Sequence, residues 1–464
     1  MNSNEKNNEE MWERIEQRIA KIMQKDKIPG LSVAVVKDQE IIYSKNFGVR
    51  NLAKNQPVTH NTLFGIGSCT KVFTCLAIMQ LAEKGLLSIN DPVKKYLPFK
   101  IGIEDKPVQI RHLMSHSSGI PNLGSATVLI LRHAPLFETW IPFATKEDMY
   151  LLVNGAQEEI VDEPGERYFY LNTGYTLLGE IIETVSGLSY EDYIEENILK
   201  PLKMSRSTFL QEKFDKDEDR MTAYIQEKDK PIEKNHPFDQ LIYAAGGLLS
   251  SANEMANFLA MMLNEGRYEN SQIISTESLE EMFSIQIDVP PNFYGRNGYA
   301  FGLGISEDFL GKKLIGHSGS TGMSSAYFCF IPELNCGVVT MANAGNIPGS
   351  LVGHSILSSL MGKDHEETVP FFQIQAKMEQ FSGEYVNYKG INKVKIYIEN
   401  GLLFYESKFG ETLNKVALIP EDAKLADNRF YIYSFGYKTP VTFEIKENNE
   451  IDLFIERNCF HKIK

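Results

Sequence analysis

The stretch FGIGSCTKVFTCLAIMQLAEKG, residues 64–85, decides the fold of this chain. Its second part, residues 71–85, is apolar around most of a helix and ends in Gly85, a residue that suits a helix C-terminus. A helix of this composition belongs inside a core. At its start stand Ser68 and Lys71, one helical turn apart and therefore on the same face. The stretch predicts a buried helix that carries a serine and a lysine at its N-terminal end.

The pair Ser68 and Lys71 suits nucleophilic chemistry. Ser68 lies near the positive end of the helix dipole, which favours a developing alkoxide. Lys71 would be partly desolvated on a core helix, and desolvation lowers a lysine pKa until the neutral amine can accept the serine proton. The alternative is an ordinary N-cap serine beside a surface lysine. The other S-x-x-K of the chain, Ser3 and Lys6, lies in the polar N-terminal tail and has no such context.

Two further motifs follow along the chain. Tyr170 and Asn172 form a Y-x-N in the segment GERYFYLNTGY, just before an apolar helix. Residues 316–322, GHSGSTG, read as a glycine-rich turn between two strands, where glycines let the backbone approach a ligand closely. Core packing of Tyr170 and a helix-capping role of Asn172 remain the alternatives to a role in a site.

The rest of the first 365 residues predicts an α+β domain whose two ends share one antiparallel sheet. A helix over 9–26 precedes a hairpin that turns at Asp38 and Gln39, helices fill the middle, and strands return before residue 345. The expected ranges are strands 31–36 and 41–49, helices 174–186, 190–198 and 252–263, and strands 300–305, 313–316, 326–331 and 336–341.

Beyond about residue 365 the pattern of polar and apolar residues changes. The polar segment 363–370 reads as a linker, and after it apolar residues alternate with period two between turns such as Asn400-Gly401. This pattern indicates an antiparallel β-barrel or sandwich. We therefore expect two domains, residues 1–365 and residues 366–464.

Composition excludes several classes of function. The net charge is −14 over 464 residues, and no basic stripe offers a surface for nucleic acid. The N-terminus is polar and acidic rather than signal-like, and no run approaches the roughly 18 apolar residues of a membrane helix. The sequence predicts a soluble, cytoplasmic protein without membrane or nucleic-acid partners.

Cysteine and histidine usage predicts neither a disulfide framework nor a metal centre. The five cysteines are odd in number and form no C-x-x-C, which favours free thiols. His112 and His116 stand four apart, but no third ligand is near. We expect structural or capping roles for both histidines.

The three motifs, in this order and with their flanking segments, resemble the serine β-lactamase and penicillin-binding-protein superfamily, most of all its class C β-lactamase-related branch of peptidases and esterases. The flanks are IRHLMSHSSGIP, LLGEIIETVSG, PLKM and AAGGLLSSANEMANF, and the resemblance covers residues 10–360. It implies a β-lactamase/transpeptidase-like α+β domain, an antiparallel sheet with helices. Some peptidases of this branch carry a C-terminal lipocalin-like or eight-stranded barrel, in agreement with the pattern beyond residue 365.

The resemblance also implies a role for each motif residue. Ser68 would be the acylated nucleophile, Lys71 its base, and Tyr170 the group that passes a proton to the leaving group. Substrate would be bound by Asn172, His317 and Gly319. The backbone N–H groups of Ser68 and Ser320 would form the oxyanion hole.

His317 departs from the pattern, because many β-lactamases carry a lysine there. A histidine near its free pKa of about 6.5 is mostly neutral at pH 7, which weakens the case for penicillins. The resemblance then favours a peptidase or amidase with esterase activity, with D-amino-acid specificity open, acting on a small molecule or short peptide without metal or organic cofactor. The resemblance is also compatible with a homo-oligomer. The alternatives are a β-lactamase or carboxylesterase, a non-catalytic penicillin-binding sensor or scaffold, and a cysteine enzyme using Cys69.

Overall fold

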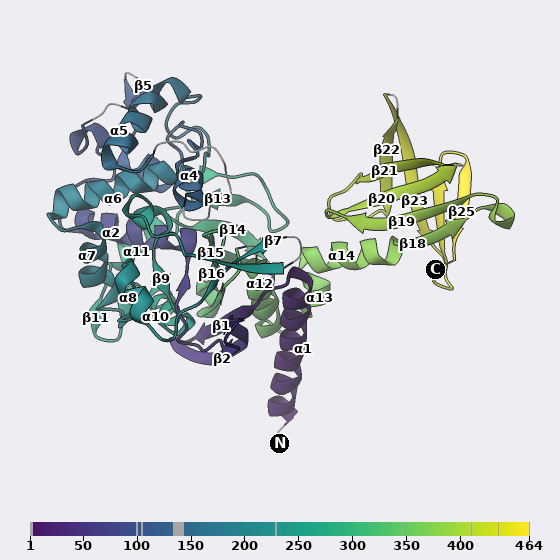
Figure 1. The fold of residues 1–464 in the computed structure, drawn as a ribbon, viewed down its shortest axis with the longest axis horizontal. Coiled ribbons are helices and arrows are strands. Elements are labelled where there is room, and N and C mark those ends of the chain that lie inside the picture. The colour runs from purple at the N-terminus through teal and green to yellow at the C-terminus, as the bar shows by residue number, and fades with distance from the viewer. Residues whose placement is uncertain are drawn as a thin grey trace. The chain divides into compact units, whose positions relative to one another are not determined.

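The computed structural model describes residues 3–463 except 99–100, 104, 133–142, 228–229, 346, 410 and 435. The chain divides into two compact units, Met1–Leu357 and Ser358–Lys464 (Figure 1). This division lies between residues 357 and 358, whereas the sequence predicts a domain boundary between residues 365 and 366, which stays a prediction.

One antiparallel sheet organises the first unit. Neighbouring strands run in the order β12-β13-β14-β15-β16-β17-β1-β2-β3. Their bounds are β1 Gly30–Lys37, β2 Glu40–Asn51, β3 Gln56–Pro57, β12 Ile287–Asp288, β13 Asn297–Tyr299, β14 Gly304–Phe309, β15 Lys312–Ser320, β16 Ser325–Ile331 and β17 Cys336–Ala342. Short two-stranded ribbons pair β4 Phe64–Gly65 with β9 Leu249–Ser250, β5 Gly102–Ile103 with β6 Lys106–Pro107, β7 Ala223–Glu227 with β8 Lys230–Lys234, and β10 Arg267–Tyr268 with β11 Ser271–Gln272.

The two ends of this unit meet in the sheet, which confirms the predicted α+β class. Strand β1 pairs with β17 in a register that sets Leu31 opposite Ala342. The hairpin from β1 to β2 turns at Asp38 and Gln39, both with positive φ, as a tight two-residue hairpin turn requires.

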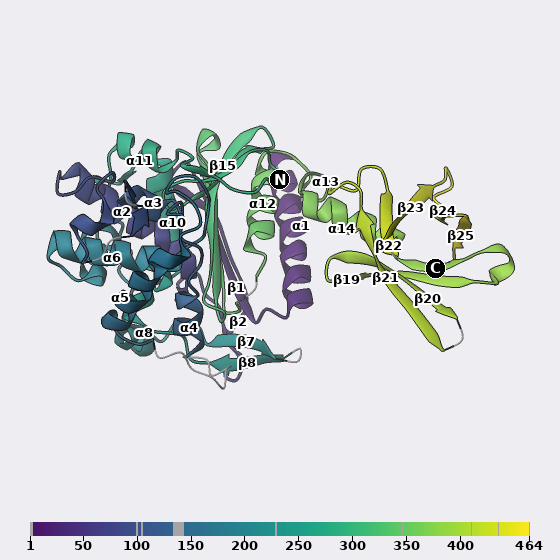
Figure 2. The same ribbon diagram turned by 90° about the horizontal axis from the view of Figure 1, so that it is seen from above.

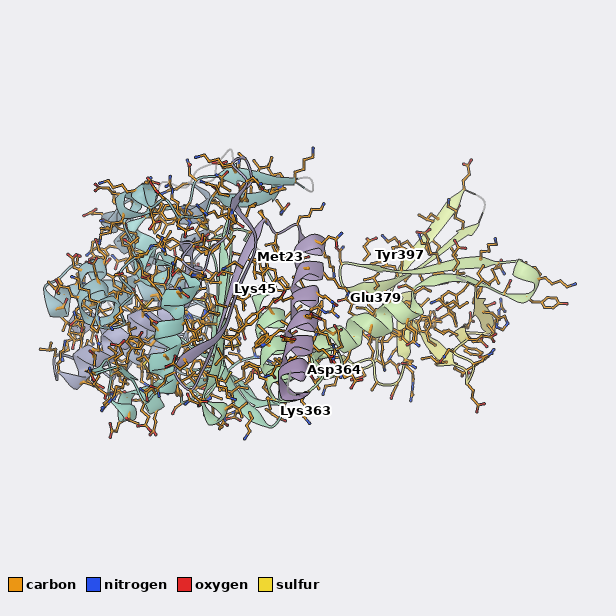
Figure 3. The ribbon with its side chains drawn as sticks, turned by 90° about the horizontal axis from the view of Figure 1, so that it is seen from below. Met23, Lys45, Lys363, Asp364, Glu379 and Tyr397 are labelled. Carbon is orange, nitrogen blue, oxygen red and sulfur yellow. The ribbon has the colours of Figure 1, made fainter. Side chains whose placement is uncertain are left out.

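Helices cover both faces of the sheet, with α1 and α12 on one face and α2, α6 and α10 on the other (Figure 2). On the first face, Trp12 of α1 stacks on Tyr43 of β2 with ring centroids 3.8 Å apart. Lys45 of β2, labelled in Figure 3, pairs with Glu16 of α1 at 3.1 Å. The helices are α1 Ser3–Asp26, α2 Lys71–Glu83, α3 Ile110–Met114, α4 Ser125–Leu131, α5 Lys146–Gly155, α6 Asn172–Ser186, α7 Tyr190–Ile194, α8 Gln211–Lys216, α9 Tyr243–Gly246, α10 Ala252–Leu263, α11 Thr276–Met282 and α12 Gly349–Leu360.

Helix α2 lies at the centre of the core, as its composition predicts. Every residue from Lys71 to Leu81 is buried. Phe73 packs against Phe258 of α10, which in turn meets Phe328 of β16. The lysine is therefore placed in the apolar interior by the helix on which it stands.

The strand predictions need two corrections. Residues 300–305 are not one strand. The Ala300 amide donates a hydrogen bond to the Leu303 carbonyl, and this bond closes a turn between β13 and β14. The glycine-rich run is not mainly a turn either, since β15 continues through Ser320 and residues 321–324 make the connection. Glycine lowers strand propensity, but the ladder with β16 prevails over it here.

The second unit contains the predicted closed antiparallel barrel. Its strands are β18 Gly383–Val386, β19 Lys393–Glu399, β20 Leu402–Phe409, β21 Thr412–Pro420, β22 Arg429–Ser434, β23 Tyr437–Ile445, β24 Ile451–Ile455 and β25 Asn458–Lys462. The barrel has its own core, in which Phe381 stacks on Phe443 with centroids 4.3 Å apart. Helix α14, which carries Glu379, lies along β19, which carries Tyr397 (Figure 3).

The predicted linker over residues 363–370 is wrong in its structure. It contains the short helix α13, His365–Thr368, and Pro370 begins α14, Pro370–Phe381. The Asp364 side chain accepts from the Glu366 amide and caps α13, while proline is tolerated in the first turn of α14. The polar run that ends in Pro370 therefore contains the N-termini of two helices.

The separate cores predict that residues 1–365 fold without the barrel. The hydrophobic cluster around α2 draws its residues from Ala34 to Met341, the barrel core begins at Phe381, and a cut after residue 365 keeps α12 whole. We expect a fragment of residues 1–365 to melt cooperatively by circular dichroism. An insoluble fragment beside a soluble full chain would show instead that the two units share a core.

Candidate active site

Ser68 lies where strand β4 gives way to the buried helix. The turn Gly67–Thr70 forms a short 3₁₀ helix, and α2 continues directly from it at Lys71. Gly67 has a φ of +51°, a conformation that favours glycine. The serine side chain reaches a pocket of about 860 Å³ that the sheet and its flanking loops line.

Lys71 is fully buried and contacts Ser68 directly. Its Nζ lies 3.0 Å from Ser68 Oγ, 2.7 Å from Asn172 Oδ1 and 2.6 Å from the Ala245 carbonyl oxygen. Burial lowers the pKa of Lys71 from 10.5 to about 7, because the ammonium loses its hydration. Near neutral pH a large share of this side chain is therefore an uncharged amine.

The three partners of Lys71 fit both of its forms, since an ammonium can donate to all three, Ser68 Oγ included. An uncharged amine has two N–H donors and one lone pair. Asn172 Oδ1 and the Ala245 carbonyl can only accept, so they take the two hydrogens. The lone pair then faces the hydroxyl of Ser68, which is the arrangement a general base needs. The capping alternative for Asn172 is not realised, because α6 begins at this residue without a side-chain cap.

Tyr170 stands beside the serine as a phenol. Its hydroxyl hydrogen-bonds Ser68, and Lys71 Nζ lies 4.9 Å from the centre of its ring. Burial raises the pKa of Tyr170 far above 10, and the bond to Ser68 offsets this in small part. The surroundings of Tyr170 therefore favour the phenol over the phenolate.

His116 holds the Tyr170 segment in place, which confirms the structural role predicted for it. Its Nδ1 accepts the Leu171 amide at 3.0 Å, and its ring packs on Tyr170 with centroids 4.1 Å apart. His112 is likewise structural, since its Nδ1 accepts the Gln109 amide in a capping box at the start of α3.

His317 lies in the pocket wall with both ring nitrogens engaged. Nδ1 lies 2.5 Å from the Ser318 carbonyl, which can only accept, so Nδ1 carries the hydrogen. Nε2 then accepts from the Tyr299 hydroxyl at 2.9 Å. Burial, with the nearby Lys71 as a lesser cause, lowers the pKa of His317 to about 3. The ring is neutral at physiological pH.

Strand β15 touches the serine turn through two glycines. A Cβ on Gly319 would come within 2.0 Å of the Ile66 carbonyl and 2.7 Å of the Ser68 nitrogen. A Cβ on Gly67 would come within 2.5 Å of the Ser320 nitrogen. The two backbone N–H groups named for the oxyanion hole, those of Ser68 and Ser320, therefore belong to segments in direct contact.

The structure thus gathers Ser68, Lys71, Tyr170, Asn172, His317, Gly319 and Ser320 around one pocket. Sequence reasoning missed other parts of it. Tyr299 fixes His317, and Ala245 fixes Lys71 through its carbonyl. The first stands in no motif, and a backbone oxygen has no side-chain signature, so neither could be found from residue types alone.

The predicted free thiols are confirmed, and a Cys69 nucleophile is not supported. All five cysteines are free. Cys69 is fully buried, and burial raises the pKa of its thiol well above the usual value. A buried neutral thiol is a poor nucleophile.

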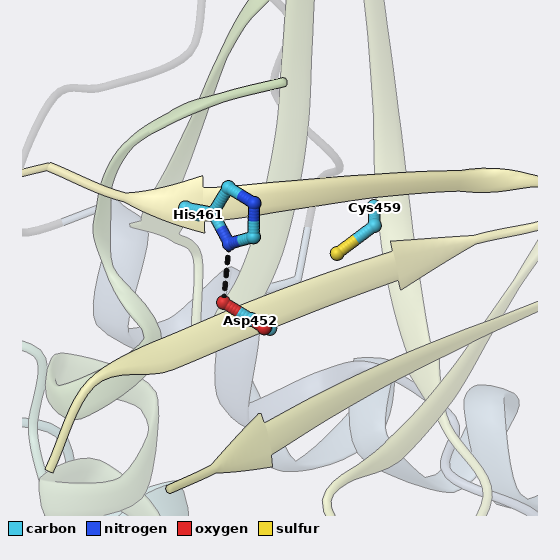
Figure 4. Close-up of side chains that lie close together, drawn as sticks. All are labelled: Asp452, Cys459 and His461. Carbon is cyan, nitrogen blue, oxygen red and sulfur yellow. Dashed lines mark hydrogen bonds and ion pairs between the residues drawn. The ribbon is translucent and has the colours of Figure 1, made fainter. Parts of the chain in front are cut away.

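A group of potential metal ligands lies in the barrel. Asp452 of β24 and Cys459 and His461 of β25 bring their ligand atoms within 4.8 Å of one another (Figure 4). Both oxygens of Asp452 already have partners, His461 Nδ1 at 2.7 Å and Lys446 Nζ at 2.8 Å. The ammonium beside the carboxylate makes this group an ion-pair cluster.

No helix in the described part of the chain is long and apolar enough to span a membrane.

Known proteins resemble both parts of the chain. The family described as Beta-lactamase matches residues 15–354, and the family described as Pab87 octamerisation domain matches residues 365–461. The solved structure of an octameric penicillin-binding protein homologue from Pyrococcus abyssi matches with a TM-score of 0.89 and 39% identity. The match covers 97% of this chain and 99% of that chain.

More distant relatives share the first part. Protein flp of Staphylococcus aureus (strain MW2) is 29% identical over 326 residues, or 69% of this chain, and the chain spans 61% of the length of that relative. A penicillin-binding protein from Bacillus halodurans matches with a TM-score of 0.59 and 24% identity, over 74% of this chain and 98% of that chain, which shows a common fold. The Beta-lactamase match alone covers well over half of the chain. On this match, the chain belongs to the Beta-lactamase family and has its serine hydrolase fold, followed by a C-terminal β-barrel.

Proposed function

We propose that this protein is a serine hydrolase that works through an acyl-enzyme on Ser68. The observation that carries the proposal is the 3.0 Å contact between Ser68 Oγ and a buried lysine whose pKa lies at about 7. A nucleophile within hydrogen-bond reach of a base that is neutral at working pH is the central requirement of covalent hydrolysis.

Acylation follows from this arrangement. Lys71 takes the hydroxyl proton as Ser68 Oγ attacks the substrate carbonyl carbon. The carbonyl oxygen becomes an oxyanion, which the N–H groups of Ser68 and Ser320 stabilise. Asn172 and the Ala245 carbonyl keep the lysine nitrogen in position through both protonation states.

Collapse of the tetrahedral intermediate breaks the bond to the leaving group, which needs a proton. Tyr170 supplies it from its hydroxyl and recovers one from the Lys71 ammonium, so its high pKa keeps it a proton relay rather than a permanent anion. Water then attacks the ester on Ser68 with Lys71 again as base. The acid is released and Ser68 regains its proton.

Amides or esters of small molecules and short peptides are the proposed substrates, hence a peptidase or amidase with esterase activity. The neutral His317 offers no fixed positive charge for the carboxylate of a penicillin. A β-lactamase or carboxylesterase on the same residues is the second candidate, favoured by the family. A non-catalytic penicillin-binding scaffold would leave the Lys71 contact with Ser68 without a use.

We also propose that the barrel assembles copies of this chain, in the cytoplasm, into an octamer. The support is the match of residues 365–461 to an octamerisation domain and the likeness to an octameric homologue over nearly the whole chain.

Replacing the nucleophile should abolish activity. In Ser68→Ala we expect no labelling by a fluorophosphonate probe and no hydrolysis of p-nitrophenyl esters, with an unchanged circular dichroism spectrum. Ser3→Ala, in the other S-x-x-K of the chain, is the matched control and should be labelled like wild type. If mass spectrometry locates the label at a residue other than Ser68, the proposed acyl-enzyme mechanism is wrong.

The pH dependence should report Lys71. Its pKa is lowered, so the neutral base is lost below about pH 7, and kcat/KM should rise up to that pH and level off above it. Lys71→Arg cannot lose its proton and should reduce kcat/KM by about 10²–10⁴-fold. An activity that falls between pH 6 and 7.5 would mean instead that a cationic His317 is required.

The assembly should be visible in solution. Eight copies of a 52.6 kDa chain weigh about 421 kDa, which light scattering after size exclusion can measure. We expect the full chain near that mass and the fragment 1–365 as a smaller species. If the fragment also elutes as an octamer, the barrel is not needed for the contacts between copies of the chain.

A further inference from the structure

The pocket at Ser68 has an uncharged lining. It is built from β13, the start of β14, the second half of β15, the start of β16, the start of α12 and the segment around Asn292. Among the described residues that line it, none is an aspartate, glutamate, lysine or arginine. A substrate charge placed there would have no opposite charge to pair with among these lining residues.

The titratable groups of the lining are neutral as well. Burial raises the pKa of Tyr168 to about 12 and moves those of Tyr170, Tyr294, Tyr299 and Tyr327 upward in the same way. It lowers the pKa of the two lining histidines, to about 3 for His317 and about 4 for His354. At neutral pH these are phenols and uncharged imidazoles.

His354 is another residue of the pocket lining. From α12 it reaches the Tyr294 hydroxyl with Nδ1 at 3.3 Å and the Tyr327 hydroxyl with Nε2 at 3.0 Å. Tyr327 fits there because α12 carries Gly349 and Gly353, where a Cβ would come within 3.0 Å of the tyrosine. Both nitrogens of His354 are engaged within the protein, so this wall offers a substrate shape and aromatic surface rather than charge.

Lys71 does not supply the missing charge. It is fully buried, its nitrogen already has three partners, and it is not among the residues that line the pocket. The mechanism above also needs it neutral when the substrate binds.

We propose that the pocket takes an uncharged substrate segment, so that the enzyme hydrolyses N-acylated peptides or neutral esters and discriminates against a free amine or a carboxylate next to the scissile bond. This inference rests on the proposed hydrolase function. Its physical basis is that a charge moved from water into a site without a counter-charge loses hydration that nothing replaces. Selectivity here comes from exclusion rather than from an added contact.

Matched alanine p-nitroanilides, in both enantiomers, test the inference on the full-length protein. N-methoxysuccinyl-alanine and N-succinyl-alanine p-nitroanilides differ by one negative charge. N-acetyl-alanine and free alanine p-nitroanilides differ in that the free amine is cationic at pH 6.5, below its pKa of about 8. We expect kcat/KM to be at least about tenfold higher for the neutral member of each pair, mainly through KM. An equal or higher value for either charged member would overturn the inference.

A charge placed in the pocket should change this preference. Ser350 lines the pocket at the start of α12, where a carboxylate is also favoured by the helix dipole. In Ser350→Asp the ratio of free-amine to acetylated substrate should rise at least about fivefold over Ser350→Asn, its uncharged isostere. An unchanged ratio would show that this substrate segment lies outside the pocket.

Failure of the inference and failure of the proposed function give different results. If the fluorophosphonate does not label Ser68, the hydrolase proposal itself fails. If Ser68 is labelled but none of the four anilides is cleaved, the proposal for the pocket fails, because it must accept the neutral members.

Discussion

The site depends on one amine nitrogen held in a dry interior. Lys71 is carried into the core by a helix that is apolar on every side, and the same burial that would destabilise an ammonium makes the neutral amine available. Its partners come from three distant parts of the chain: the turn before α2, the start of α6 and the end of α9. Packing around α2 therefore fixes Lys71, Ser68 and Asn172 in a single arrangement.

Sequence reasoning reached the parts of this arrangement that leave a local signature. The apolar helix, the hairpin at Asp38 and Gln39, and the alternating strands of the barrel follow from periodicity and turn chemistry, and all are present. It failed where a tertiary partner decides the outcome. The glycines of β15 suggested a turn, but pairing with β16 extends the strand to Ser320, and the polar run before Pro370 suggested a linker although it caps a helix.

The same limit applies to the site. The S-x-x-K, Y-x-N and H-x-G motifs pointed to the residues that now lie together, because each motif is local and its order is characteristic. Tyr299, Ala245 and His354 belong to no motif, and their roles arise from what faces them across the pocket. His317 shows the difference most clearly. The family resemblance implied that His317 binds substrate, whereas its neighbours use both of its ring nitrogens.

The pairing of β1 with β17 has a consequence for how the protein is made. Strand β1, residues 30–37, can pair with β17 only after residues 336–342 have been synthesised. Likewise, the turn at Ser68 can contact Gly319 and Ser320 only after those residues have been synthesised. Contacts this distant in sequence form slowly, since a long loop must close before they can stabilise anything. A ribosome that has made Ser68 must therefore translate about 250 further residues before the backbone contact with Gly319 and Ser320 can form. During that interval the nascent chain carries Ser68 and Lys71 without the segments that complete the pocket.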